Sequence, residues 1–352
     1  MNKMRESVFI SFLRTFCKSF ALVFGIGLGV LAVGVFFSLS AKSVGGEDTT
    51  QMIIKPDEEG RRAPLPSSSP VILRIDIHGF IGSRLLNARL IETQLLDSRE
   101  KMLKNDRVQA IILHIDSPGG TVQDSHDIYA SLMAYKKEYE VPIYAYINGM
   151  CASGGMYIAC SADKIFASST GVIGSIGVIM GPKFNVSKLM ERYGISQVTL
   201  TEGKGKDLLS PYRPLDEEGL SSLKDILAYN YKQFTDVVVE NRPRVDRNKL
   251  INTYGAQLYD PPKAQEIGYI DESRATYFSV LKQLAEAAEI DEEPYQVIEL
   301  KPSHSLLSNF LQGQSSIFSG RIKHEFELIP GLNTEWMGRS LYLYCPALQN
   351  GR

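Results

Sequence analysis

The chain has 352 residues, of which 44% are hydrophobic and 22% are charged, and its formal net charge is −2. These values are typical of a globular protein with one large or two ordinary domains, and they exclude a mainly disordered chain. The nearly neutral charge argues against nucleic acid as a partner, because neutralising phosphates requires an excess of basic residues. The four cysteines lack the paired spacing of a zinc site, and we expect Cys151 and Cys160 to be small buried residues rather than a disulfide.

The N-terminal region has the composition of a membrane anchor. Residues 1–19 hold four basic side chains and one acid, and we interpret them as a cytoplasmic segment. An uncharged apolar stretch, Phe20–Leu39, follows. A helix of that length spans about 30 Å, the thickness of the hydrocarbon core of a bilayer. We therefore predict a single-pass anchor at residues 20–40. Since positive flanks stay in the cytoplasm, the remainder is expected on the extracytoplasmic, periplasmic side of the inner membrane.

A cleaved signal peptide is the alternative to a retained anchor, since Ser38-Leu39-Ser40 resembles a cleavage site of small residues. The apolar cores of cleaved peptides are about 7–15 residues long, shorter than this one, so the retained anchor is preferred. Residues 41–70 are polar and contain four prolines. This composition predicts a flexible linker without a core of its own.

From residue 71 onward, strand patterns alternate with helix patterns. We predict strands at 71–77, 110–115, 141–147, 164–167, 197–201 and 295–300, and helices at 90–103, 124–135, 155–161, 185–193, 215–241, 264–267 and 277–288. This alternation predicts an α/β domain, residues 71–290, with a mainly parallel sheet covered on both faces. In such sheets ligands bind beyond the C-terminal ends of the strands. Residues 291–352, with an apolar patch at 306–311, form a C-terminal extension that we expect to dock on the domain or on a neighbouring subunit.

The stretch most informative about function is 148–160. It follows a predicted strand and leads into a predicted helix through a cluster of small residues. A strand that enters a helix through a tight turn exposes the side chain at the turn, and the helix N-terminus offers free N–H groups to an oxyanion. Ser153 occupies that turn and is the candidate nucleophile. A closely packed turn without catalytic function is the plainer interpretation of the same residues.

A serine nucleophile requires a base. The histidines stand at 78, 114, 126, 304 and 324. We expect His114 to have a packing or surface role and His126 to be solvated, so a Ser-His-Asp triad remains possible but awkward. Lysine is the other known base, and it acts only when burial lowers its pKa. Lys204 and Lys206 lie in a glycine-rich loop that could deliver an amine or could simply be a surface turn, and spacing alone does not choose between them.

Five motifs together resemble the signal peptide peptidase A (protease IV) family of membrane-anchored serine peptidases. They are DSPGG at 116–120, ASGGMY at 152–157, TGVIGSIGV at 170–178, GKGKD at 203–207 with SPYR at 210–213, and AQEIGYID at 264–271. The resemblance covers about residues 71–271 and implies a fold of parallel sheets with flanking helices, similar to Clp protease and the crotonases.

The resemblance assigns roles to individual residues. It makes Ser153 the nucleophile and Lys206 the general base, with Lys204 as the second choice. Ser175 matches the serine that holds the lysine amine, and the N–H groups of Gly120 and Gly154 match the oxyanion hole.

Two positions depart from the family. Gly205 stands where the family usually has an aromatic or similar residue, which leaves the choice between the two lysines less certain. His114 stands where arginine is frequent, and no role is assigned to it.

The chain carries one copy of the motif set, like the short members of the family. These assemble into rings, and the resemblance implies a homo-oligomer in which the serine of one subunit meets the lysine of the next. It also implies peptide substrates such as remnants of signal peptides, and no metal or organic cofactor. A crotonase-like enzyme acting on acyl thioesters and a non-catalytic membrane scaffold of the same fold are the alternatives.

Overall fold

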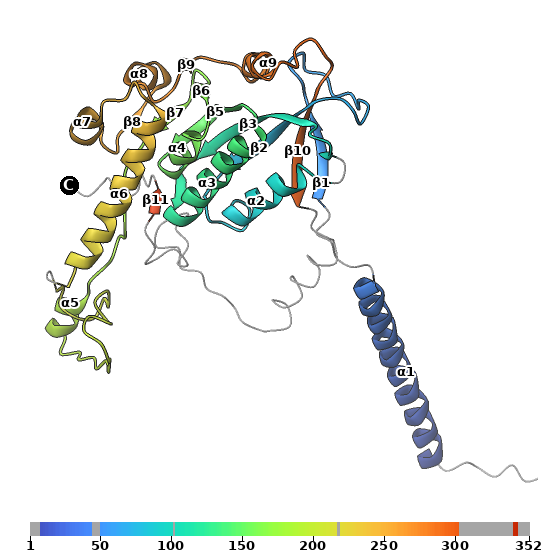
Figure 1. The fold of residues 1–352 in the computed structure, drawn as a ribbon. Helices are drawn as coiled ribbons and strands as arrows, with labels where there is room; N and C mark the ends of the chain where they lie inside the picture. Colours follow the sequence, from blue (N-terminus) through green and yellow to red (C-terminus); the bar gives the residue numbers. More distant parts are fainter. Residues whose placement is uncertain (1–7, 44–49, 101–102, 217–218, 303–340, 344–352) are drawn as a thin grey trace, which may run out of the picture. The chain divides into compact units, whose positions relative to one another are not determined.

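A computed structural model describes residues 8–43, 50–100, 103–216, 219–302 and 341–343 of the chain (Figure 1). The chain divides into two units. The first contains the N-terminal helix, and the second contains residues 50–301 together with the C-terminal strand. Each unit is described by itself. The predicted apolar patch at 306–311 lies outside the described residues.

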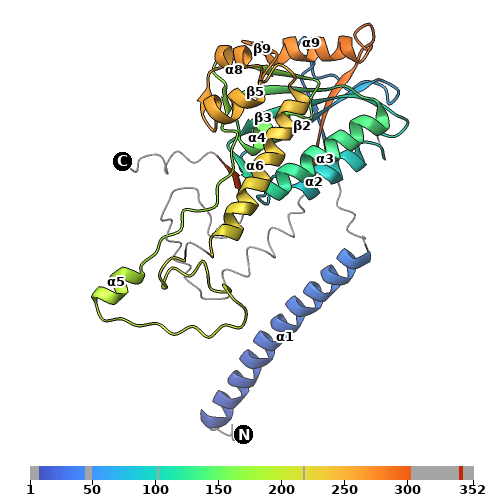
Figure 2. The ribbon, with the colours of Figure 1, turned by 60° about the vertical axis from the view of Figure 1, so that its left-hand side comes forward.

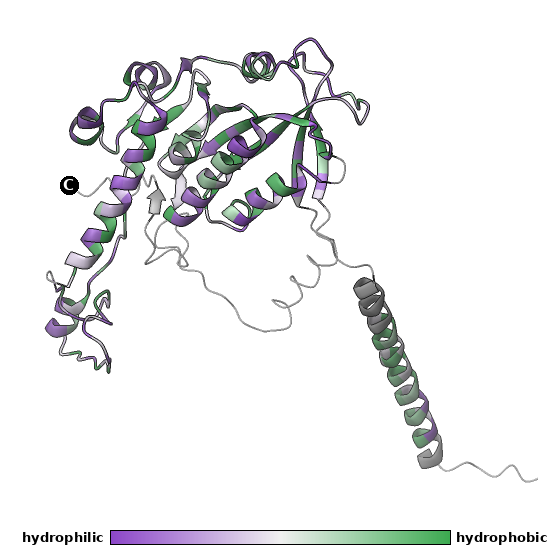
Figure 3. Ribbon diagram, in the orientation of Figure 1, coloured by the Kyte–Doolittle hydropathy of each residue, from purple (hydrophilic) through white to green (hydrophobic). Residues whose placement is uncertain are grey.

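The first unit is the helix α1, Val8–Ser43. Its segment Phe12–Gly34 has 23 residues and a mean hydropathy of 2.1, and none of it is buried. Hydrophobic residues predominate along this segment (Figure 3). A helix of this length and composition is able to cross a membrane, and the predicted anchor, 20–40, lies inside the boundaries of α1.

The second unit is built on a mainly parallel sheet. Its centre consists of four parallel strands in the order β2 (Val71–His78), β3 (Val108–Ser117), β5 (Ile143–Ala152) and β6 (Lys164–Ala167). These strands occupy the four ranges predicted between 71 and 167. Their sequences are rich in isoleucine, valine and leucine, and most of their residues are buried, as expected for a sheet that is covered on both faces.

Further strands extend the sheet on each side. β10 (Gln296–Pro302) runs parallel to β2, β1 (Thr50–Lys55) lies outside it, and β9 (Glu272–Ser273) runs parallel to β6. β7 (Val172–Gly174) continues beside the end of β5 and pairs antiparallel with β8 (Leu258–Tyr259). Thus β1 lies in the range predicted as linker, and β10 lies in the range predicted as C-terminal extension.

Helices cover both faces of this sheet. One core packs α2 (Ala88–Asp97), α3 (Val122–Tyr139), α4 (Gly154–Ala159) and part of α6 (Ser221–Asn241) against the sheet. A smaller core on the opposite face is formed with α9 (Tyr277–Ala287). Side chains cap several of these helices, as when Thr121 accepts a hydrogen bond from the N–H of Asp124 at the start of α3. α2 ends at Asp97, six residues before the end of the predicted helix.

Three short helical segments complete the domain: α7 (Arg247–Lys249), a π-helical turn (Leu250–Tyr254) and α8 (Pro261–Ile267). α8 begins with Asp260 as a cap and two prolines, and it ends at Gly268, whose φ of 96° is a left-handed conformation that favours glycine.

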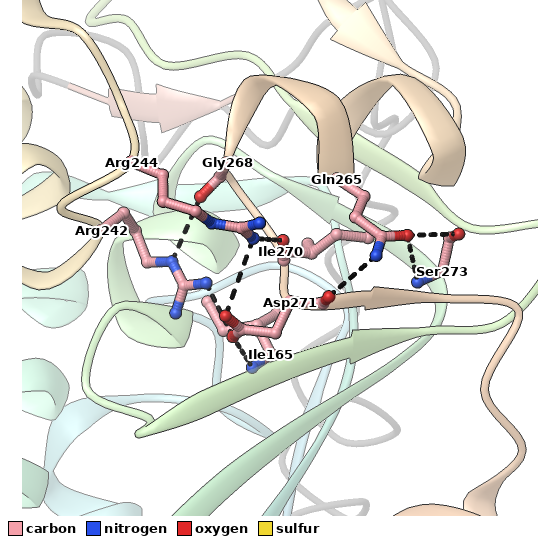
Figure 4. Close-up of polar contacts among 8 residues, drawn as sticks. All are labelled: Ile165, Arg242, Arg244, Gln265, Gly268, Ile270, Asp271 and Ser273. Carbon is pink, nitrogen blue, oxygen red and sulfur yellow. Dashed lines mark hydrogen bonds and ion pairs between the residues drawn. The ribbon is translucent and has the colours of Figure 1, made fainter.

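The motif at 264–271 anchors α8 to the sheet through polar contacts (Figure 4). The Arg242 guanidinium, buried at 4% exposure, lies 2.6 Å from the Asp271 carboxylate. Asp271 also accepts a hydrogen bond from the N–H of Ile165 in β6 (2.8 Å). Gln265 donates to the Asp271 carbonyl and accepts two hydrogen bonds from Ser273. These contacts join α8, β6, β9 and the end of α6.

Residues 179–216, which we call the arm, differ from the rest of this unit. They contain α5 (Ser187–Arg192), which lies beyond the end of α6 and away from the sheet in both views (Figures 1 and 2). The prediction of a strand at 197–201 is wrong, because these residues form neither helix nor strand and are all exposed. The apolar side chains of Val198 and Leu200 favour a strand, but no strand in the described part of the chain pairs with this segment, and the two side chains are 86% and 94% exposed.

Candidate active site

Ser153 lies at the junction between β5 and α4, as the sequence predicted for the turn. Its φ of 53° and ψ of −113° form a conformation that non-glycine residues rarely adopt. Its N–H donates to the Gly174 carbonyl (2.8 Å), and its own carbonyl accepts from the N–H of Tyr157 (3.0 Å), the first bond of the helix. A strained residue between strand and helix is a frequent feature of nucleophile turns.

Ser175 reaches the same place through strand pairing. Ala152 lies opposite Gly174 in the β5–β7 pair, so the two serines follow neighbouring strand ends. Ser175 also has a positive φ, 54°, and its N–H donates to the Gln257 carbonyl (2.8 Å). Both serines are buried. The Ser153 hydroxyl lies 3.4 Å from the Gly177 carbonyl, a long hydrogen bond that leaves it available for another acceptor.

The two predicted oxyanion-hole glycines lie side by side. A Cβ at Gly154 would lie 3.2 Å from the backbone nitrogen of Gly120 and 2.4 Å from Ser125 Oγ. A Cβ at Gly120 would lie 1.9 Å from the carbonyl oxygen of Ile81. Only glycine fits at either position without movement of the neighbours, and the close approach of the two backbones is what a pair of convergent N–H donors requires.

The strand that contains Gly120 has a partner from the end of the chain. β4 (Gly119–Thr121) pairs antiparallel with β11 (Leu341–Leu343), and Tyr342 stands opposite Gly120. A peptide that paired with this edge of β4 would have to replace β11.

The two candidate lysines lie elsewhere. Lys204 and Lys206 are exposed residues of the arm, and the single chain brings neither of them to Ser153. Two polar contacts connect the end of this loop to the rest of the arm. The Arg213 guanidinium lies 2.6 Å from the Asp207 carboxylate, and the Asn185 side chain donates to the Arg213 carbonyl (2.7 Å). The glycines on either side of Lys204 both have positive φ and open space around them.

The other nucleophiles and bases near the turn are less suitable. Cys151 and Cys160 are buried and free, which confirms the prediction that they form no disulfide. Burial raises the pKa of the Cys151 thiol and raises that of Cys160 to about 12, so both remain protonated and unreactive at neutral pH. His126 is exposed and lies 3.0 Å from the Tyr157 hydroxyl. Among the described residues, no histidine hydrogen-bonds to Ser153.

Comparison with known proteins finds two matching families and several relatives named as proteases. The family described as peptidase family S49 matches residues 135–291, and the Clp protease family matches 87–170. A putative signal peptide peptidase SppA of Enterococcus faecium is 32% identical over 211 residues, which are 58% of this chain and 60% of that protein. A putative protease, slr0021, of Synechocystis is 32% identical over 205 residues, which are 58% of this chain and 70% of that protein.

Two further matches are more distant. The probable protease SohB of Haemophilus influenzae is 31% identical over 140 residues, which are 40% of this chain and 39% of that protein. Among solved structures, a mutant of the membrane-bound stomatin-specific protease 1510-N in complex with a substrate peptide has a TM-score of 0.42 and 14% identity. It covers 71% of this chain and 99% of the other. The chain thus spans less than two thirds of the first of its sequence relatives.

Proposed function

Because the chain belongs to peptidase family S49, we propose that it is a membrane-anchored serine endopeptidase with Ser153 as nucleophile and Lys206 as general base. The observation that carries this proposal is the arrangement around Ser153: a buried serine in a strained turn, beside two glycine backbones and a second buried serine. The family match and the protease relatives agree with this chemistry.

The reaction begins when the neutral amine of Lys206 accepts the proton of the Ser153 hydroxyl as its oxygen attacks a peptide carbonyl. The N–H groups of Gly120 and Gly154 donate hydrogen bonds to the oxyanion that forms, an interaction worth about 10²–10³ in rate for each donor. Lys206 then protonates the leaving amine, and water hydrolyses the acyl-enzyme. Ser175 orients the amine.

The lysine comes from a second copy of the chain in this proposal. A lysine acts as a base only when burial lowers its pKa, whereas Lys206 is exposed in the single chain. The arm also exposes large apolar side chains that a soluble monomer would rarely leave in water: Phe184, Leu189, Tyr193, Ile195, Val198, Leu200, Tyr212 and Leu215. Packing of the arm against a neighbouring subunit would bury these side chains and bring Lys206 close to the neighbour's Ser153.

The helix α1 is proposed as the anchor, with the peptidase domain on the extracytoplasmic side. Its apolar segment is long enough to span a bilayer, and the basic residues before it favour a cytoplasmic N-terminus. An anchored site would act on peptides in or near the membrane, and remnants of signal peptides are the substrate class that we propose.

Co-expression of two inactive variants tests the shared site. Ser153→Ala and Lys206→Ala proteins are each expected to lack peptidase activity, and the assembly that contains both is expected to regain part of it, because some interfaces then hold an intact pair. Lys204→Ala in place of Lys206→Ala is the matched control and is expected to be active alone. If the mixed assembly stays inactive, shared sites are refuted.

A serine-directed acylating probe separates the peptidase from its alternatives. Mass spectrometry is expected to find the probe on Ser153 of the wild type and little of it on Lys206→Ala. A crotonase-like enzyme would retain thioester activity in Ser153→Ala, and a non-catalytic scaffold would take up no probe. Either outcome would refute the peptidase.

A further inference from the structure

We propose that Asp76, His78 and His114 form a binding site for a transition-metal ion, with Zn²⁺ as the expected occupant. This site is separate from the arrangement around Ser153 and does not depend on the proposed peptidase function. Each of the three residues offers a ligand atom, and these atoms lie within 4.8 Å of one another.

Strand register brings the three side chains together. Asp76 and His78 are two residues apart on β2, so their side chains point to the same face of the sheet. His114 stands opposite Asp76 on the neighbouring strand β3. Their face is the one that α9 covers, as the ring contacts of His114 with Tyr146 (5.6 Å) and Tyr277 (5.8 Å) show, whereas α4 packs on the other face.

The distances between the ligand atoms are close to those of a metal site. His78 Nε2 lies 2.7 Å from His114 Nδ1, and one oxygen of Asp76 lies within 4.8 Å of the ligand atoms of both histidines. Two nitrogen ligands at 2.0–2.1 Å from a tetrahedral zinc ion are about 3.3 Å apart, so the imidazoles need to separate by about 0.6 Å. The His78 side chain, 42% exposed and at the end of its strand, is free to make this movement.

The surroundings hold the ligands in place. The Arg74 guanidinium donates to Asp76 Oδ1 (2.7 Å), which fixes the carboxylate and leaves Oδ2 for another contact. His114 is 8% exposed and held among aromatic rings. Ligands oriented by such hydrogen bonds and by packing are usual in metal sites. Arg74 also brings a positive charge, which its contacts with the Asp76 carboxylate and the Tyr277 ring (5.1 Å) partly offset.

The chemistry of the ligands favours zinc. Two imidazoles and one carboxylate suit Zn²⁺ and its neighbours in the first transition row better than Mg²⁺ or Ca²⁺, which prefer oxygen ligands alone. Three protein ligands would leave the fourth position of a tetrahedral ion to water. A bound ion would link β2 to β3 just before Gly79–Ile81 and Gly119–Thr121, two segments that pair through Ile81 and Gly120.

Zinc titration of the metal-free full chain in detergent tests this proposal by calorimetry, with the thermal midpoint as a second measurement. The wild type is expected to bind Zn²⁺ and to gain thermal stability with it. His78→Ala and the isosteric Asp76→Asn are each expected to bind at least about 10- to 100-fold more weakly, the loss typical when even a supporting contact is removed. His126→Ala, which removes an exposed histidine elsewhere, is the matched control and is expected to bind as the wild type does.

Two results would overturn the site. One is a wild type that binds no zinc under these conditions. The other is His78→Ala or Asp76→Asn protein that binds zinc with the stoichiometry and affinity of the wild type, which would place the ion elsewhere and leave the two imidazoles as a simple hydrogen-bonded pair. Circular dichroism of each variant shows whether it has folded, and a substitution that fails to fold is replaced by His78→Gln.

Discussion

The surroundings of Ser153 and the arm that carries Lys206 are built in opposite ways. Ser153 is 1% exposed and lies between β5 and α4, beside the end of β7, whereas the described part of the arm contains one six-residue helix, and Leu200 within the arm is 94% exposed. A strained backbone conformation in a buried turn persists only where the packing of the surrounding residues holds it in place. The single chain thus encloses the proposed nucleophile, while the proposed base lies on an exposed surface.

The largest expected effect separates the two lysines of the arm. Lys206→Met is expected to lower kcat by about 10²–10⁴, the usual contribution of a general base, without changing the thermal midpoint, since the side chain is exposed in the single chain. Lys204→Met is expected to retain most of the activity. Peptidase assays with both variants measure the difference, and the reverse result would transfer the role of base to Lys204.

A smaller effect is expected at the glycine beside the nucleophile. Gly154→Ala places a methyl group 2.4 Å from Ser125 Oγ and 3.2 Å from the Gly120 nitrogen, so it should lower stability and reduce kcat by about 10²–10³. Adding Ser125→Ala removes the first contact and should restore much of the stability but not the activity. Thermal unfolding and kinetics of the single and double variants test this separation. Full recovery of activity in the double variant would contradict an oxyanion hole at this position.

Two ion pairs allow the stability of the two regions to be compared. Arg242→Met removes the buried guanidinium beside Asp271, a carboxylate that is 32% exposed and keeps contacts with Arg244 (3.8 Å) and the Ile165 N–H. It is expected to cost about 1.5–3 kcal/mol of unfolding free energy, as for the loss of a hydrogen bond to a charged group. Arg213→Met breaks the pair with Asp207 in the arm, in which the two side chains are 27% and 23% exposed. It is expected to cost less than about 1 kcal/mol but to reduce activity, because Asp207 follows Lys206. Denaturant unfolding measures both, and equal losses would show that the arm is as firmly packed as the sheet.

The smallest effect on the isolated chain is expected from Leu200→Asp. The side chain is almost fully exposed, so the thermal midpoint of a monomer should not change. Assembly should weaken, since a charge would enter the proposed interface, and activity should fall with it. Light scattering in detergent gives the oligomeric state, with Thr199→Asp as a neighbouring control at an exposed polar position. Unchanged assembly would exclude this part of the arm from the interface.

The sequence determined the elements whose signal is local. The apolar runs of β2, β3, β5 and β6 were predicted from their composition, and so were the N-terminal helix and the turn at Ser153, because small residues between a strand and a helix allow few other conformations. The motifs also predicted the neighbourhood of Gly120 and Gly154. Parallel strands place their C-terminal ends at one edge, and both glycines follow such ends.

Only the tertiary structure decided the features that depend on long-range pairing. β7, β8 and β11 have only two or three residues each, and β1 lies in a polar, proline-containing region, so their pairing partners rather than their sequences make them strands. The apolar alternation at 197–201, by contrast, pairs with none of the described strands. The same reason applies to His78 and His114. They are 36 residues apart in the sequence, and neither histidine by itself indicates a metal site. The register of two neighbouring strands brings their nitrogens to 2.7 Å, and no pattern within either strand specifies that register.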